Sequence, residues 1–193
     1  MKKKLRSFLI DKFSLLLSHY QIQKLALVKA LPNVSIHDNF ILGDYSEIIM
    51  KDGCKKLEIA PNVSTHKFCL FSVGAHAALS INENVFFNNY CSINCMGSIT
   101  IGKNTLFGEG VKLYDHNHKY HFNELKELKI SRDEYKIGDI TIGANCWIGS
   151  NVTILNNVEI GDNVIIGANN LIYKSIPSNT IVKAKFEQST ETI

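Results

Sequence analysis

An aliphatic residue recurs every six positions along the C-terminal part of the chain. The series is Ile142, Ile148, Ile154, Ile160, Ile166 and Ile172, and an asparagine follows three residues after nearly every member. Six is neither the period of an α-helix nor the simple alternation of a strand. It suits a coil with three short flat faces, one hexapeptide per face and about eighteen residues per turn. The aliphatic side chains would stack inside the coil, while Gly and Asn would occupy corners that need positive φ.

The same phase extends backwards through most of the chain. It includes Ile101, Phe107 and Leu113, shifts by two residues, and resumes through Ile93, Phe87 and Ile81, with weaker repeats back to residue 33. Residues 114–138 are the one long departure from the period, so we expect them to project from the coil as a loop. The predicted fold is an all-β solenoid over residues 33–185, preceded by a helical segment (1–32) and followed by a tail (186–193).

The first residues combine a basic start with an apolar helical pattern. Apolar residues at helical spacing are Leu5, Phe8, Leu9, Phe13, Leu16 and Tyr20. Asp11 and Lys12 interrupt the apolar run, so we expect neither a secretory signal nor a membrane span. Two interpretations stay open: the helix packs on its own domain or a neighbouring subunit, or it contacts an anionic membrane surface.

Composition narrows the remaining classes. The chain has 193 residues and a net charge of +3, with scattered basic residues, which does not indicate a nucleic-acid partner. It has five cysteines without paired C-x-x-C motifs, which predicts reduced thiols in a cytoplasmic protein. Cys91 and Cys146 fall on core positions of the repeat and are interpreted as packing residues.

Two stretches resemble a known family. They are "FFNNYCSINCMGSITIGKNTLFGEGVKLYDHNH" and "ITIGANCWIGSNVTILNNVEIGDNVIIGANNLIYKSIPSNTIV". They are similar to the hexapeptide-repeat acyltransferases with a left-handed parallel β-helix, above all the galactoside and maltose O-acetyltransferases and relatives that modify surface polysaccharides. The resemblance implies a homotrimer with active sites between neighbouring coils, acetyl-CoA as acyl donor, and a carbohydrate or lipid-linked glycan acceptor at the cytoplasmic face of the membrane.

Residues 113–121 carry three histidines where the repeat breaks off. Transfer of an acetyl group to an alcohol needs a base that takes the hydroxyl proton, and histidine suits this task. The resemblance puts His118 at the position of the catalytic base, with His116 as the alternative. Asp115 could orient an imidazole, although an ordinary surface aspartate is the simpler interpretation. The cluster could also be a polar loop tip.

The resemblance also suggests the substrate-binding residues. It puts Asn88 at the acceptor site, although Asn88 could equally be a corner residue of the coil. It puts Trp147 against CoA, the backbone amides of Ser150 and Ala168 along the pantetheine arm, and Lys174 near the CoA phosphates. The family's proline after the catalytic histidine is absent here, and the loop that follows is highly charged with a helical tendency.

Two other classes remain possible. A γ-type carbonic anhydrase would hold zinc through His116 and His121, with His76 or His66 as third ligand. A non-enzymatic β-helix scaffold would leave the histidines and Trp147 unexplained. The transferase hypothesis requires no metal.

Overall fold

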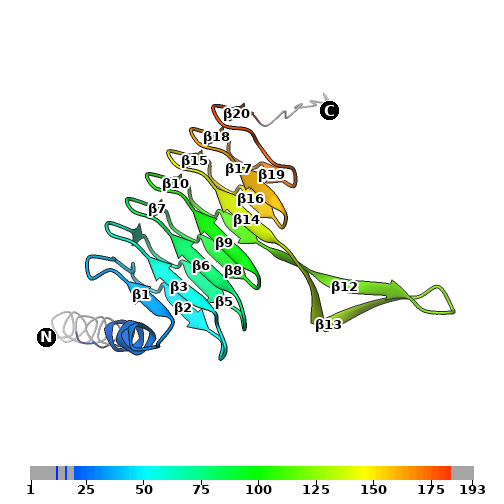
Figure 1. Cartoon of the computed structure of the whole chain (residues 1–193), viewed down its shortest axis with the longest axis horizontal. Helices are drawn as coiled ribbons and strands as arrows, with labels where there is room; N and C mark the ends of the chain where they lie inside the picture. Colours follow the sequence, from blue (N-terminus) through cyan, green and yellow to red (C-terminus); the bar gives the residue numbers. More distant parts are fainter. Residues whose placement is uncertain (1–11, 13–15, 17–19, 184–193) are drawn as a thin grey trace, which may run out of the picture.

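The computed structural model describes residue 12, residue 16 and residues 20–183. Three six-stranded parallel sheets form the sides of a solenoid, as the hexapeptide period predicts and consistent with the left-handed β-helix (Figure 1). The first sheet, sheet A, contains β1 (Val34–Ile36), β3 (Lys56–Ile59), β6 (Ala78–Ile81), β9 (Ser98–Ile101), β14 (Asp139–Ile142) and β17 (Val158–Ile160). Sheet B contains β4 (Ser64–Thr65), β7 (Phe86–Phe87), β10 (Leu106–Phe107), β15 (Trp147–Ile148), β18 (Ile165–Ile166) and β20 (Ile181–Val182). Sheet C contains β2 (Glu47–Met50), β5 (Leu70–Val73), β8 (Ser92–Cys95), β11 (Lys112–Tyr114), β16 (Thr153–Leu155) and β19 (Leu171–Ile172).

The core is a set of side-chain columns inside the coil. Each strand pairs in register with the strand one turn away, so equivalent inward residues stack directly. Three phenylalanines, Phe71, Phe87 and Phe107, are almost fully buried, and the rings of Phe87 and Phe107 stack at 4.6 Å. Burial of such columns is the main source of stability in a solenoid, because each turn contacts only its neighbours.

The turns differ in length. Ile142 pairs with Ile160, which gives the expected turn of 18 residues, but Ile59 pairs with Ile81, 22 residues later. In sheet C the longer turns contain four-residue strands such as β5, where the later turns have β16 with three residues and β19 with two. The expectation of a uniform turn is therefore wrong for the N-terminal half, although the inward stacking is kept.

The asparagines lie at the corners with positive φ, as expected. At the corner between sheets A and B, Asn62, Asn84, Asn104, Asn145 and Asn163 have φ between 57° and 59°, apart from 55° at Asn104. Their amides form a ladder in which each side-chain N–H donates to the next asparagine, for example from Asn84 to Asn104 at 3.0 Å. In this row of amides, each asparagine keeps its side chain hydrogen-bonded while its backbone has the left-handed conformation of the corner.

The glycines of the repeat serve another purpose than the one expected. Positive φ occurs only at Gly53 and Gly110 among the glycines of the described residues. At Gly143, a Cβ would lie 2.6 Å from the backbone of Gly161 in the next turn. The repeat therefore needs glycine at this position because adjacent turns approach too closely for a side chain.

Residues 20–29 form a helix that packs against the first turn (Figure 1). Leu25 and Val28 contact the core, and the Gln21 side-chain amide donates to the Ser46 carbonyl at 3.2 Å. Part of the predicted helix thus packs on its own domain. The tail and most of the first nineteen residues lie outside the described residues. No helix in the described part of the chain combines the length and hydropathy that a bilayer crossing requires.

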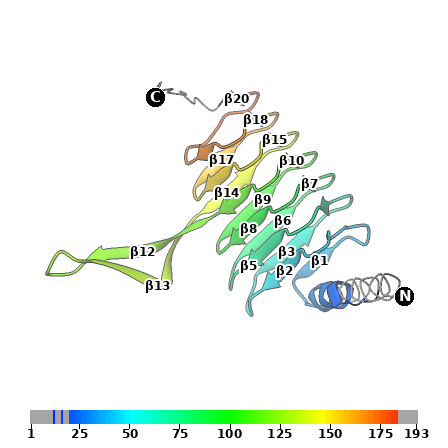
Figure 2. The same ribbon diagram turned by 180° about the vertical axis from the view of Figure 1, so that it is seen from behind.

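The departure at 114–138 projects outward, as expected, but its conformation is not helical. It forms an antiparallel hairpin of β12 (His116–Phe122) and β13 (Leu128–Ile137), which extends away from the coil in both views (Figure 2). Cross-strand pairing of Tyr120 with Ile130 and of Phe122 with Leu128 overrides the helical tendency of its charged residues. The hairpin leaves from the corner between sheets C and A.

Candidate active site

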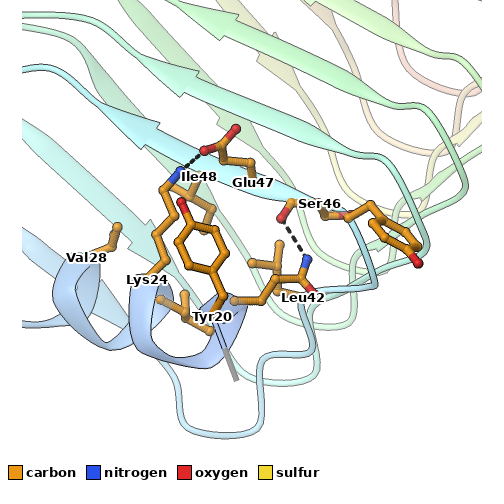
Figure 3. A pocket seen from close by; sticks show the side chains of 10 residues that line it. Tyr20, Lys24, Val28, Leu42, Ser46, Glu47 and Ile48 are labelled. Carbon is orange, nitrogen blue, oxygen red and sulfur yellow. Dashed lines mark hydrogen bonds and ion pairs between the residues drawn. The ribbon is translucent and has the colours of Figure 1, made fainter. Parts of the chain in front are cut away.

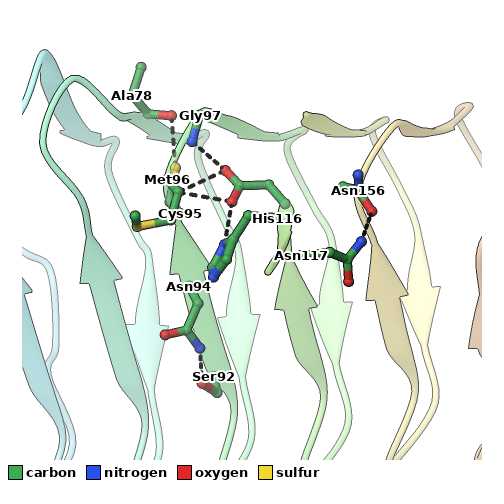
Figure 4. A network of polar contacts seen from close by, with 10 residues as sticks. Ala78, Ser92, Asn94, Cys95, Met96, Gly97, His116, Asn117 and Asn156 are labelled. Atoms are coloured by element: carbon green, nitrogen blue, oxygen red, sulfur yellow. Dashed lines mark hydrogen bonds and ion pairs between the residues drawn. The ribbon is translucent and has the colours of Figure 1, made fainter. Parts of the chain in front are cut away.

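A buried carboxylate lies where the hairpin leaves the coil. Asp115 follows β11 and points inward, and its side chain has no exposed surface. Its two oxygens accept the backbone N–H groups of Met96 at 2.8 Å and Gly97 at 2.8 Å, one turn earlier (Figure 4). The interpretation of Asp115 as an ordinary surface residue is therefore wrong: alternation along β11 turns it into the coil, and the bend at residues 96–97 supplies its donors.

His116 is held by this carboxylate. Its Nδ1 lies 3.0 Å from Oδ1 of Asp115, and its side chain is 18% exposed. Because a carboxylate only accepts, Nδ1 is the donor in this contact, and in the neutral imidazole this leaves a lone pair on Nε2. An imidazole oriented in this way, with its outer nitrogen open, can take a proton from a bound hydroxyl.

His118 has a different environment on the hairpin. Its Nδ1 lies 3.0 Å from the Ser131 carbonyl, and the residue is exposed. The Tyr135 ring contacts both imidazoles, with centroids 5.1 Å from His116 and 4.8 Å from His118. The two histidines thus share one face of β12, as expected from their spacing. Tyr135 was not singled out by sequence, because only the hairpin pairing brings it opposite His118.

The hairpin has a second, more apolar face. A register shift between His118 and Tyr120 changes the alternation of β12. Beside it lies a cavity of about 890 Å³ whose lining comes from the hairpin: Asn117, His118, Lys119, Tyr120, Phe122, Leu128, Ile130 and Lys136. His121, expected to face solvent, is exposed.

Asn88 takes part in the corner between sheets B and C. Its side-chain oxygen accepts the backbone N–H of Asn89 at 2.8 Å. This contact fits the corner interpretation of Asn88. An acceptor-site role stays a prediction.

Three of the four expected CoA residues lie close to one another along the coil. Trp147 is on the outer face of sheet B, 55% exposed, between Leu106 and Ile165 of the adjacent turns. Ser150 and Ala168 lie at the corner between sheets B and C in consecutive turns, where the Asn169 N–H donates to the Ser150 carbonyl at 2.8 Å. Lys174 is exposed after β19, with its ammonium 5.7 Å from the Tyr173 ring centroid.

These groups do not meet within one chain. His116 lies beyond the C-terminal end of a sheet C strand, where the hairpin leaves the coil. Ser150 and Ala168 lie before the N-terminal ends of sheet C strands. A strand of sheet C and its flanking corner residues separate them. Within one chain, the candidate base and the expected CoA contacts therefore lie at opposite ends of the sheet C strands.

The cysteines lie inside the coil, and burial raises the pKa of several of their thiols. All five are buried and free. Burial, together with the neighbouring Asp115 charge, raises the pKa of the Cys95 thiol, and burial raises the pKa of the Cys54 and Cys146 thiols. Neutral buried thiols are poor nucleophiles.

The described residues contain no group of three or more His, Cys, Asp and Glu side chains placed to hold a metal ion. His66 contacts the Phe86 ring on the side of sheet B, and His76 occupies a corner with φ of 63°. Neither joins His116 and His121 within one chain.

Comparison with known proteins supports the fold. The family described as bacterial transferase hexapeptide (six repeats) matches residues 139–174. No curated protein matches the sequence. The match covers the regular turns and leaves out the hairpin and the longer N-terminal turns.

Solved structures with a similar fold are hexapeptide-repeat and other acyltransferases. A hexapeptide-repeat acetyltransferase from Vibrio cholerae is 21% identical, with a TM-score of 0.51 over 83% of this chain and 74% of that chain. A mutant of AntD, an N-acyltransferase from Bacillus cereus solved with dTDP and coenzyme A, is 19% identical, with a TM-score of 0.54 over 74% and 77%. The polysialic acid O-acetyltransferase OatWY is 20% identical, with a TM-score of 0.50 over 81% and 90%.

Proposed function

We propose that this protein is an acetyl-CoA-dependent O-acetyltransferase that acts on a sugar hydroxyl. The observation that carries the proposal is the Asp115–His116 pair, a buried carboxylate 3.0 Å from the Nδ1 of a partly exposed imidazole. The hexapeptide repeat and the acyltransferase folds that resemble this chain support the same class.

His116 acts as the general base in this proposal, in preference to His118. Its Nε2 takes the proton of the acceptor hydroxyl as the oxygen attacks the thioester carbon. Asp115 holds the ring and stabilises the imidazolium that forms, as a buried carboxylate can only when its own hydrogen bonds are satisfied. The proton then passes from Nε2 to the departing CoA thiolate, so the enzyme returns to its starting state without a covalent intermediate.

The complete site forms between two copies of the chain in a homotrimer. The edge of sheet C with His116 faces the corner of a neighbour that carries Ser150 and Ala168. The outer faces of sheets A and B differ in polarity, and this difference supports packing between copies. The outer face of sheet A is polar, with Glu58, Thr100 and Glu159 among its residues. That of sheet B exposes an apolar column: Leu106, Trp147, Ile165 and Ile181. A contiguous apolar column on a surface is typical of an interface.

The acceptor is a carbohydrate or a lipid-linked glycan, and we place the enzyme in the cytoplasm near the inner face of the membrane. The basic start of the chain and the exposed Leu16, Tyr20 and Leu27 support a peripheral contact of the helix with anionic lipid.

The test is thiol release from acetyl-CoA with three size-graded acceptor series, from one to six sugars: sialic acid oligomers, maltooligosaccharides and chitooligosaccharides. Mass spectrometry of the product identifies the acetylated hydroxyl. We expect acceptor-dependent release in at least one series and no stoichiometric zinc in the purified protein. Zinc bound in stoichiometric amount, with bicarbonate formation and no transfer, would instead establish the carbonic anhydrase class.

A further inference from the structure

Three aromatic rings stack along the corner between sheets B and C. Tyr45 and Phe68 have centroids 5.0 Å apart at 9°, and Phe68 and Tyr90 have centroids 5.1 Å apart at 4°. We call these three residues the aromatic ladder. The spacing matches the separation of adjacent parallel strands, so each ring comes from one turn of the coil.

Both the backbone conformation and the exposure of the three ladder residues are energetically unfavourable. All three residues have positive φ, between 58° and 61°, a conformation that bulky side chains rarely adopt. Their rings are 44–55% exposed. At the same corner in later turns the chain has Asn151 and Asn169, which tolerate this conformation. Strained and exposed aromatic residues in place of asparagine point to a role in recognition.

Along the coil axis, the aromatic ladder and the expected CoA contacts lie on opposite sides of the turn that contains His116. Along this corner the order is the ladder, then Gly110, then Ser150 and Ala168, as the corner-to-corner backbone bonds show. Gly110 belongs to the same turn as His116, and the two expected CoA contacts belong to the two turns that follow it. The donor therefore occupies one side of the His116 level, and the ladder occupies the other.

Hydrogen-bonding groups flank the rings. Lys67 pairs with Asp44 at 3.1 Å, and its backbone N–H donates to the side chain of Asn89 at 3.2 Å. These residues directly precede the ladder residues at each corner. Aromatic surface beside charged and amide groups matches a sugar ring, which has an apolar C–H face and a polar rim.

The far end of the ladder reaches a cavity of about 370 Å³ between the helix and the first turn (Figure 3). Tyr45 is part of its lining, with Tyr20, Leu42 and Ile48, and an ion pair between Lys24 and Glu47 crosses beside it. The surface thus continues from the His116 level to the N-terminal end of the coil.

We propose that the aromatic ladder binds a glycan chain of three or more sugar units and holds it so that a hydroxyl reaches His116 of a neighbouring copy of the chain. This rests on the proposed O-acetyltransferase function and specifies its acceptor as an oligosaccharide or polysaccharide. Tyr90 lies about 5 Å and Tyr45 about 15 Å from the His116 level, judged from the separation of adjacent strands. A monosaccharide at His116 can reach no further than Tyr90, whereas a chain of three or more units can also contact Phe68 and Tyr45.

The experiment compares Phe68→Asn/Tyr90→Asn with wild type in the three acceptor series, in both turnover and direct binding. Asparagine removes the rings and keeps the positive φ, as at Asn151 and Asn169, so the coil is expected to fold. Asn84→Gly, at the corner between sheets A and B in the same turn as Tyr90, is the matched control, because glycine also tolerates the positive φ of this position. Binding to the free protein is measured by saturation-transfer NMR without acetyl-CoA.

We expect the double variant to raise KM for the longest accepted oligomer about tenfold, as loss of one good aromatic contact does, with a smaller change for the monosaccharide. Loss of long-chain binding in the variant alone supports the ladder even if none of the acceptors is acetylated. Transfer that is equally efficient for all lengths in wild type and variant overturns the ladder and leaves the proposed function intact. A change in subunit number in the variant, with unchanged KM, overturns it by assigning the rings to an interface. Absence of both transfer and binding in every series overturns both proposals.

Discussion

The coil and the hairpin are built on opposite principles. In the coil, side chains of successive turns stack over one another, and residues such as Ile154 have no exposed surface. In the hairpin, β12 and β13 pair only with each other, and the apolar residues Tyr120, Phe122 and Ile130 are 61–69% exposed. The coil thus fixes the position of whatever it carries, whereas the hairpin presents a surface that a partner can cover. Both candidate bases lie on β12, but His116 is tied to the coil through Asp115, whereas His118 is held within the hairpin.

The largest expected effect concerns the two candidate bases. His116→Ala should lower kcat by about 10²–10⁴, because it removes the base that the coil holds through Asp115. His118→Ala should lower kcat by less than about tenfold, since its exposed imidazole contacts the Ser131 carbonyl and the Tyr135 ring but no carboxylate. Steady-state kinetics with a saturating acceptor measure both.

His121→Ala is the matched control on the hairpin, where the side chain is exposed. Full turnover in His116→Ala, together with a large loss in His118→Ala, would return the base to His118 and contradict the preference for the coil.

Next in size is the stability difference. Ile154→Ala should lower the free energy of unfolding by about 2–5 kcal/mol, because it opens a cavity in a closely packed column. Ile130→Ala, at an exposed hairpin position, should change it by about 0.5 kcal/mol or less. Urea denaturation followed by circular dichroism measures both, and a loss in Ile130→Ala as large as in Ile154→Ala would mean that Ile130 is buried in solution.

A smaller effect is expected at the predicted CoA contacts. Trp147→Ala should weaken CoA binding about tenfold, the size of one lost aromatic contact, while the melting temperature stays near that of wild type. Calorimetric titration with CoA measures the affinity. Trp147→Phe, which keeps a ring, should retain most of it, and unchanged affinity in Trp147→Ala would remove this residue from the CoA site.

The smallest expected effect is at Cys95. Burial and the Asp115 charge raise the pKa of its thiol, so iodoacetamide at neutral pH should leave the thiol unmodified in the folded protein. Mass spectrometry of the alkylated protein checks this. Rapid labelling of Cys95 would show that the Asp115 environment opens in solution.

The repeat determined most of the fold. An isoleucine every six residues can be buried continuously only if each hexapeptide forms one side of a three-sided coil, and the asparagines mark the corners where φ is positive. The period on both sides of residues 114–138 also determined that this segment leaves the coil, because no turn can accommodate so long an insertion. In the N-terminal half the six-residue period was harder to recognise, because turns of 22 residues are not a multiple of six.

Only the tertiary structure decided the site. Asp115 reads as one polar residue among many, and its burial depends on the N–H groups of Met96 and Gly97, one turn earlier. Tyr135 meets the histidines only through the pairing of β12 with β13, which local propensity opposed. His116 is likewise separated from Ser150 and Ala168 because it lies at the corner between sheets C and A, whereas they lie at the corner between sheets B and C. Sequence period dictates which residues face inward, because that depends on local spacing; which polar groups meet depends on contacts between turns, which spacing alone does not specify.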